Sequence, residues 1–326
     1  MKKQFFLIAA LVLFSFAACT DKNVPETQNN ETTEQEEGGE DKPEPAKPDY
    51  FGKDAKVNTN YQAKPFTVGT DKQIVFAQGN LQYQASTNTW QFAEDQNERL
   101  GRAANLAISA TNSNWLDLFG WGTSGYNNKY PYMTSRKNED YGDGTNDIAG
   151  TDYDWGQYNA IRNGGNVKGE WRLLTRNEWM YMFDTRANAE NLRAFATVDT
   201  VKGYLLLPDD YVFPSGIGFT AGTLDWTKNI YNLEQWKQME AAGAVFLPTT
   251  GLRAGDDHFS SFTTDGCYWN GTCPSYTLGG ETHWSTIDGG EFWFQKGRAT
   301  PKGSTSRLYG LAVRLAKDVY LKSPRL

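Results

Sequence analysis

The sequence predicts an α+β fold of small twisted antiparallel sheets, two or so helices and long loops. Aromatic residues and glycine are abundant, with 11 Trp, 17 Tyr, 18 Phe and 32 Gly among 326 residues. After the first residues, the apolar stretches are short and interrupted by Gly, Pro, Asn and Asp. This pattern is typical of many short strands joined by turns, whereas helical patterns are few.

Residues 1–19 have the pattern of an export signal. Lys2 and Lys3 precede an apolar run that is too short to span a bilayer permanently. Small residues stand directly before Cys19, as in the lipobox of bacterial lipoproteins. We therefore expect cleavage before Cys19 and a lipid on its thiol, with an ordinary signal peptide and an incidental cysteine as the alternative. The residue after Cys19 is not Asp, which favours the outer membrane, with the cell surface or the periplasmic face both open.

Residues 20–50 are predicted to be a disordered acidic linker. Ten acidic residues face three lysines in this segment, and aromatic residues are missing from it until its last position. Such a chain cannot bury enough apolar surface to fold, and its charges keep it extended. The segment carries a net charge of −7, which equals the formal charge of the whole chain, so no basic field is left to attract nucleic acid.

Residues 51–326 are predicted to form a single domain. Alternating apolar and polar residues predict strands over residues 73–84, 291–295 and 309–316. In the last two, alternation places one set of side chains in the core: Phe292, Phe294, Val313 and Leu315. The alternate set is expected to face outward: Glu291, Trp293 and Gln295. Arg314 is expected to reach a buried carboxylate or loop carbonyls.

Two helices are predicted. The first begins at Thr175, with Glu178 three residues later as a capping box requires, and buries Leu174, Trp179, Met182 and Phe183. The second runs over residues 232–242 and ends at Gly243, with an apolar face of Leu233, Trp236, Met239 and Ala242. The long loops between the predicted elements, above all residues 112–169, have no predicted structure of their own.

Four segments carry a family resemblance. They read WRLLTRNEW (171–179), GAVFLPTTGLR (243–253), CYWNGT (267–272) and RLYGLAVRLA (307–316), with FGWGTSGYN (119–127) as a further match. In this order they resemble the C-type-lectin-like fold of the formylglycine-generating, or sulfatase-modifying, type. Bacterial surface lipoproteins of the major paralogous domain kind and retroelement-diversified variable proteins share this fold. The resemblance covers residues 66–317 and implies the fold far more than the function, because the fold hosts enzymes and binding proteins.

In the diversified proteins, the segment before the last strand is the ligand-binding surface. Residues 266–309 resemble that arrangement and are rich in aromatic and small polar residues, as binding surfaces are. About half of the aromatic residues must be core, with Trp269 first among them. The expected ligand-binding residues, for a protein or glycan ligand, are Asn270, Tyr276, Trp284, Glu291, Trp293, Lys296, Arg298, Ser304 and Tyr309.

Cys267 and Cys273 have two interpretations. They lie near the segment where formylglycine-generating oxidases keep a copper-binding pair, but their spacing is one residue wider and the flanking sequence differs. In an exported protein, a short disulfide between them is the favoured interpretation.

Calcium is the metal cofactor that the acidic loop favours. Residues 138–154 are rich in hard oxygen ligands, with Asp143, Asn146, Asp147 and Asp152 as the candidates. Asx-turns in a solvated loop explain the same residues. With His258 and His283 as the only histidines, zinc and histidine-based catalysis have little support.

These observations together predict a lipid-anchored envelope protein that binds a ligand, for example in adhesion, and has no catalysis of its own. The alternatives are an oxidase of the formylglycine-generating kind and a structural subunit of a surface appendage such as a pilus tip.

Overall fold

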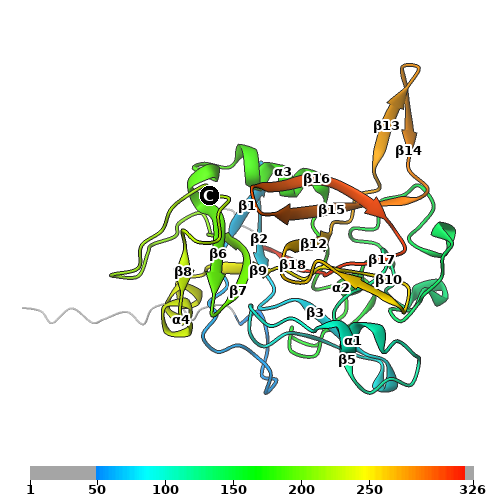
Figure 1. The fold of residues 1–326 in the computed structure, drawn as a ribbon, viewed down its shortest axis with the longest axis horizontal. Coiled ribbons are helices and arrows are strands. Elements are labelled where there is room, and N and C mark those ends of the chain that lie inside the picture. Colours follow the sequence, from blue (N-terminus) through cyan, green and yellow to red (C-terminus); the bar gives the residue numbers. More distant parts are fainter. Residues whose placement is uncertain (1–48, 320–326) are drawn as a thin grey trace, which may run out of the picture. The chain divides into compact units, whose positions relative to one another are not determined.

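The computed structural model describes residues 49–319. The predicted signal at residues 1–19, with the lipid expected on Cys19, and nearly all of the 20–50 linker lie outside the described residues. The predicted α+β class is confirmed, because small antiparallel sheets dominate and helices are few and short (Figure 1). Within the described part, no helix is long and apolar enough to cross a membrane.

The first sheet joins the two ends of the described part. Its strand order is β1-β2-β18, where β1 is Phe66–Gly69, β2 is Lys72–Phe76 and β18 is Ala316–Val319. The prediction of a continuous strand over residues 73–84 is wrong. The chain turns after β2, and a separate strand, β3, spans Leu81–Gln84. At this turn Gly79 lies against the backbone of Ala93, where an added Cβ would be 2.3 Å from the carbonyl oxygen.

Two further sheets occupy the first two thirds of the domain. In the sheet of order β4-β3-β5, β4 is Thr89–Phe92 and β5 is Trp115–Leu116. The largest sheet has the order β8-β6-β7-β9, and its strands are β6 (Arg193–Val198), β7 (Val201–Leu206), β8 (Ile230–Tyr231) and β9 (Val245–Pro248). Only β6 and β8 pair in parallel among the paired strands of residues 49–319.

The last third of the chain forms two three-stranded sheets and one separate hairpin. The strands of the first are β12 (Asp265–Trp269), β15 (Asp288–Gln295) and β16 (Arg298–Ser306). Those of the second are β10 (Leu252–Ala254), β11 (His258–Ser260) and β17 (Tyr309–Gly310). The hairpin consists of β13 (Ser275–Leu278) and β14 (Glu281–Trp284), inserted between β12 and β15. Residues 311–315, predicted as part of a strand, make single bridges at Leu311 and Ala312 instead.

Both predicted helices are present, and the capping box predicted at Thr175 is confirmed. Helix α3 (Arg176–Met180) begins after Thr175, whose side chain and Glu178 form the capping box, and it continues into one π-helical turn, η4 (Tyr181–Thr185). Helix α4 (Leu233–Ala241) begins after Asn232 with a second capping box. The predicted apolar face of this helix is wrong at Leu233, because this side chain in the first turn is 44% exposed. The remaining short helices are α1 (Arg102–Leu106), α2 (Trp155–Tyr158), η1 (Ala85–Thr87), η2 (Tyr126–Asn128), η3 (Asn138–Asp140) and η5 (Ala189–Leu192).

An aromatic core joins α3 to the C-terminal strands. Trp179 stacks on Phe292 with 4.9 Å between ring centroids, and Tyr204 packs against both Phe292 and Phe294. The four side chains predicted to point inward, Phe292, Phe294, Val313 and Leu315, are fully buried, so that prediction is confirmed.

Arg314 is buried in this core and binds oxygen atoms from several segments. Its guanidinium donates to the carbonyl oxygens of Ala77 and Phe246 and to the side chains of Asn80 and Gln96. The expected contact with loop carbonyls is therefore confirmed. A charge held this way stays buried because each of its three guanidinium nitrogens has a hydrogen-bond partner.

Candidate ligand-binding surface

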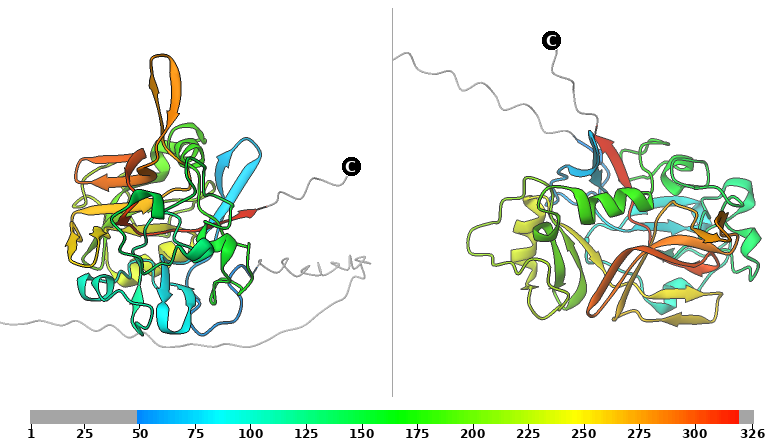
Figure 2. Two further views of the ribbon diagram at one scale, coloured as in Figure 1. Left: turned by 90° about the vertical axis from the view of Figure 1, so that its right-hand side faces the viewer. Right: turned by 90° about the horizontal axis from the view of Figure 1, so that it is seen from above.

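The hairpin β13–β14 projects away from the rest of the domain (Figure 1; Figure 2, left). Its strands are joined by Gly279 and Gly280, which have φ angles of 62° and 87°. Positive φ at both central residues is what a tight two-residue hairpin turn requires, and glycine reaches it without strain. The sequence around this turn, YTLGGETHW, therefore folds locally into a ribbon.

Each face of the hairpin carries an exposed aromatic ring. Tyr276 pairs with His283, and their rings stack at 5.5 Å; Leu278 lies on the same face. Trp284 pairs with Ser275 on the opposite face. The exposed fractions of these large apolar residues are 57% for Tyr276, 65% for Leu278 and 49% for Trp284. The hairpin therefore presents to water the residue types that protein-binding surfaces use most.

Arg307 anchors the base of the hairpin. Its side chain is buried and donates to the carbonyl oxygens of Ser285 at 2.8 Å, Gly144 at 2.7 Å and Asp288 at 3.0 Å. Its guanidinium also lies 4.5 Å from the ring centroid of Trp121. The carbonyl of Pro274 accepts from the amide of Ser285 and closes the ribbon. The hairpin is thus held firmly at its base, while its two strands hydrogen-bond only to each other.

Five of the predicted ligand-binding residues are exposed: Tyr276, Trp284, Lys296, Arg298 and Ser304. Trp293 and Tyr309 are half-buried, and the guanidinium of Arg298 lies 5.3 Å from the ring centroid of Trp293. The structure places the first two of these residues on the hairpin and the others on β15, β16, β17 and the turn between β15 and β16. The predicted residues therefore come from two regions, the hairpin and the strands β15 to β17, and of these residues Tyr276 and Trp284 on the hairpin carry the exposed rings.

Asn270 and Glu291 were predicted on this surface, and that prediction is wrong. Asn270 is fully buried, and its carboxamide oxygen accepts from the amide of Thr272 at 3.0 Å. Glu291 is only 8% exposed and hydrogen-bonds the thiol of Cys267. Burial raises the pKa of Glu291 to about 7. Glu291 pairs with the buried Trp269, so the outer face of β15 is also covered at this end.

The prediction of a disulfide between Cys267 and Cys273 is wrong. Both cysteines are free thiols, and both are buried. Cys267 hydrogen-bonds Glu291, and burial raises its pKa well above the ordinary value. Cys273 accepts from Arg307 at 3.3 Å and contacts the carbonyl of Ser285 at the hairpin base. Each thiol therefore has a polar partner of its own inside the domain.

The candidate calcium ligands do not gather around one point. Across residues 49–319, no group of three or more acidic, histidine or cysteine side chains could hold a metal ion. The carboxylate of Asp147 accepts from the amide of Cys273 at 2.7 Å, and Asn146 donates to Asp143 at 3.2 Å. Asp152 is exposed. These contacts favour the alternative interpretation, in which the loop is ordered by its own hydrogen bonds.

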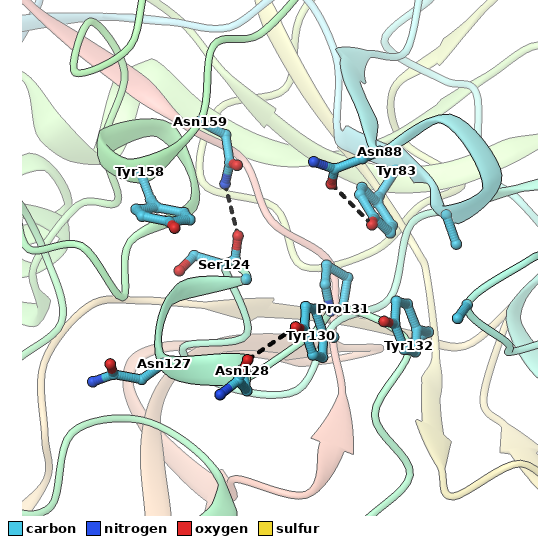
Figure 3. A pocket seen from close by; sticks show the side chains of 13 residues that line it. Tyr83, Asn88, Ser124, Asn127, Asn128, Tyr130, Pro131, Tyr132, Tyr158 and Asn159 are labelled. Carbon is cyan, nitrogen blue, oxygen red and sulfur yellow. Dashed lines mark hydrogen bonds between the residues drawn. The ribbon is translucent and has the colours of Figure 1, made fainter.

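A second candidate site is a pocket that the sequence reasoning missed. Its volume is about 500 Å³, within the range of small-ligand sites. It lies between β3 with η1 and the loop that carries η2, with α2 on a further side (Figure 3). Four tyrosines and four asparagines dominate its lining, and we call it the tyrosine–asparagine pocket: Tyr83, Tyr130, Tyr132, Tyr158, Asn88, Asn127, Asn128 and Asn159.

Sequence signals for both sites exist. The two glycines at 279–280 between alternating residues predict a hairpin. The segment GYNNKYPYM at residues 125–133 concentrates tyrosine and asparagine in a loop. The sequence does not show that the pocket lining also includes Tyr83, Asn88 and Tyr158, which come from distant elements. A comparison with protein-family models, curated proteins and solved structures finds no match for this chain.

Proposed function

We propose that this chain is a lipid-anchored binding protein of the cell envelope, which contacts a protein partner through the β13–β14 hairpin. In this proposal the signal is cleaved, Cys19 carries the lipid, and the acidic linker of residues 20–50 spaces the domain from the outer membrane. The domain binds and does not catalyse. The observation that carries the proposal is the projecting hairpin with exposed Tyr276 and Trp284 on opposite faces.

The energetics of the hairpin support a partner. An isolated two-stranded ribbon is marginal in water, because it buries little apolar surface on either face. The free domain therefore leaves three large side chains exposed to water: Tyr276, Leu278 and Trp284. A bound partner would bury them. Burial of such aromatic and aliphatic side chains is the main favourable term in protein association.

The shape of the hairpin favours a protein over a glycan at this surface. The ribbon projects and offers two free strand edges, whose amide and carbonyl groups can pair with another chain. Small ligands instead use concave sites. The hairpin carries Glu281 as its only charged Asp, Glu, Lys or Arg side chain, so apolar contact and backbone pairing, not charge, would hold the partner.

The C-type-lectin-like fold is part of the proposal. Short antiparallel sheets, long ordered loops and the capped helix α3 against the C-terminal strands support it. In the diversified proteins of that fold the segment before the last strand is the variable ligand-binding surface, and the hairpin lies within the corresponding segment of this chain.

Partner capture from intact cells tests the proposal. The full-length chain is crosslinked in cells and purified, and captured proteins are quantified by mass spectrometry. Changing Tyr276→Ser together with Trp284→Ser should abolish capture of a discrete partner. The matched control, Val212→Ser with Leu233→Ser, removes exposed apolar side chains elsewhere and should leave capture unchanged. Equal capture by the hairpin variant and the wild type would refute the proposal.

The identity of the captured proteins separates a receptor from an appendage subunit. An appendage subunit should bring assembly partners of the same cell, whereas a receptor should bring surface or host material. Mass spectrometry of the membrane fraction tests the lipid on Cys19, and protease treatment of whole cells tests surface exposure.

A further inference from the structure

The tyrosine–asparagine pocket shares no lining residue with the hairpin, and the proposed function does not use it. Its walls are held by hydrogen bonds that do not depend on a ligand. The amide of Asn159 donates to the carbonyls of Ser124 and Trp155, and the hydroxyl of Ser124 donates to the carbonyl of Asp152. The pocket is therefore preformed, which lowers the entropic cost of binding.

Two tyrosine hydroxyls orient two asparagine side chains in the same way. Tyr83 donates to the carboxamide oxygen of Asn88 at 3.1 Å, and Tyr130 donates to that of Asn128 at 3.0 Å. Each carboxamide keeps its NH₂ group, which makes no hydrogen bond with the described residues. Figure 3 shows the nitrogen of Asn88 directed into the open space between the walls. Both groups can thus donate to a ligand oxygen.

The pocket also offers an open aromatic face. The rings of Tyr130 and Tyr132 stack with centroids 5.2 Å apart and an interplanar angle of 4°. Tyr130 is 38% exposed, so part of its side chain remains accessible beside this stack. An apolar ligand face can pack there while polar groups reach the asparagines.

The lining carries no charged side chain. Asp, Glu, Lys and Arg are absent from the residues around the pocket within the described part. Burial, with the nearby hydroxyls of Tyr132 and Tyr130, raises the pKa of Tyr83 to about 12, and burial also raises the pKa of Tyr132. These phenols therefore stay neutral at physiological pH. A charged ligand would lose its hydration without gaining a counter-charge from these lining residues. The ammonium of Lys168, outside the lining, lies 4.4 Å from the ring centroid of Tyr158.

We infer that the tyrosine–asparagine pocket binds a neutral saccharide. A sugar ring has a C–H face that can lie on Tyr130 and hydroxyl groups that can accept from Asn88 and Asn128. This combination of an apolar face with many hydroxyls and no charge matches the pocket in each respect. The site is independent of the hairpin, so one chain would hold a protein with its hairpin and a glycan in its pocket.

Calorimetric titration of the full-length chain tests this inference. The probes are neutral oligomers of glucose, mannose, xylose and N-acetylglucosamine, with oligogalacturonate as the charged probe. We expect at least one neutral oligomer to bind with an affinity that added salt does not change, and oligogalacturonate not to bind. Failure of every neutral oligomer, or preference for the charged one, would overturn the inference.

Matched variants locate the binding. Asn88→Asp replaces an exposed NH₂ donor by a carboxylate and should weaken binding by roughly tenfold or more, the effect of one lost hydrogen bond and one new unpaired charge. The control Asn188→Asp makes the same change at another exposed asparagine with positive φ and should leave affinity unchanged. Equal affinity of Asn88→Asp and Asn188→Asp would contradict the assignment.

Ring variants separate the pocket from the hairpin. Tyr130→Ala should weaken saccharide binding, and Tyr130→Phe, which keeps the ring and removes the hydroxyl that orients Asn128, should weaken it less. Tyr276→Ala on the hairpin should leave it unchanged. If Tyr276→Ala alone abolished saccharide binding, the sugar would belong to the hairpin and the pocket assignment would fail, while loss of protein capture is measured separately.

Discussion

Trp269 is the last residue of β12, before the inserted hairpin, and Trp284 is the last residue of the hairpin itself, yet 1% of the first and 49% of the second is exposed. Trp269 lies on β12, pairs with Glu291 and donates from its indole to the carbonyl of Phe119 at 2.6 Å. Trp284 lies on the hairpin, whose strands pair only with each other. The comparison teaches that pairing partners, and not residue type, decide which rings of this segment are framework and which are free to bind.

The two tryptophans give the largest expected difference. Trp269→Ala should lower the free energy of unfolding by about 3–5 kcal/mol, because it leaves a cavity and removes the indole hydrogen bond to Phe119. Trp284→Ala should change it by less than about 0.5 kcal/mol, as exposed substitutions do. Urea denaturation of both variants measures this, and similar losses for both would mean that the hairpin belongs to the cooperative core.

Substitutions at the base of the hairpin should lower the free energy of unfolding, as core substitutions do, whereas substitutions on its projecting strands should not. Arg307→Met removes the donors of three backbone carbonyls and should cost about 2–3 kcal/mol of unfolding free energy. Arg298→Met, at the exposed first residue of β16, is the control and should cost less than about 0.5 kcal/mol. A small effect of Arg307→Met would show that the hairpin is not clamped at its base.

Glu291→Gln should remove part of the pH dependence of stability. Burial raises the pKa of Glu291 from 4.5 to about 7, so the folded protein holds this proton more tightly than the unfolded chain does. Its contribution is therefore complete below pH 4.5 and is lost as pH rises through about 7, by on the order of 2 kcal/mol. Denaturation at a series of pH values should show a flatter profile for Glu291→Gln. The hairpin control Glu281→Gln should keep the wild-type profile, and identical profiles for all three proteins would contradict the burial of Glu291.

The smallest expected effect concerns the hairpin turn. Gly279 has a φ of 62°, which asparagine tolerates, and Asn-Gly is a favoured pair for this turn. Gly279→Asn should therefore stabilise the hairpin by a few tenths of a kcal/mol and leave global unfolding unchanged. Hydrogen exchange of the hairpin amides should slow, and the amount of captured partner should rise. Faster exchange would mean that the turn differs from the one described.

Local sequence signals predicted much of the framework. Thr175 with Glu178 marked the start of the first predicted helix, and Gly243 marked the end of the second, because caps depend on neighbouring residues alone. Alternation correctly placed Phe292 and Phe294 inside. The same rule failed at Glu291, because it assumes that one face of a strand is wet, whereas this end of β15 is covered on both faces.

The candidate sites depended on contacts that alternation and spacing do not encode. The hairpin is the exception, because the two glycines at residues 279–280 are a local signal for its tight turn. The pocket brings together Tyr83, Tyr130 and Tyr158 from three separate segments, so only the tertiary fold assembles it. The disulfide was predicted from compartment and count, but Glu291 and Arg307 give the two thiols separate partners.

Site-specific photocrosslinking tests the central claim most directly. A benzoylphenylalanine replaces Trp284 on the hairpin or, as the control, the equally accessible Leu233 on α4, and intact cells expressing the full-length chain are irradiated. We predict one discrete protein adduct from position 284 and none from position 233. The absence of an adduct at 284, or the same adducts from both positions, would contradict a binding role for the hairpin.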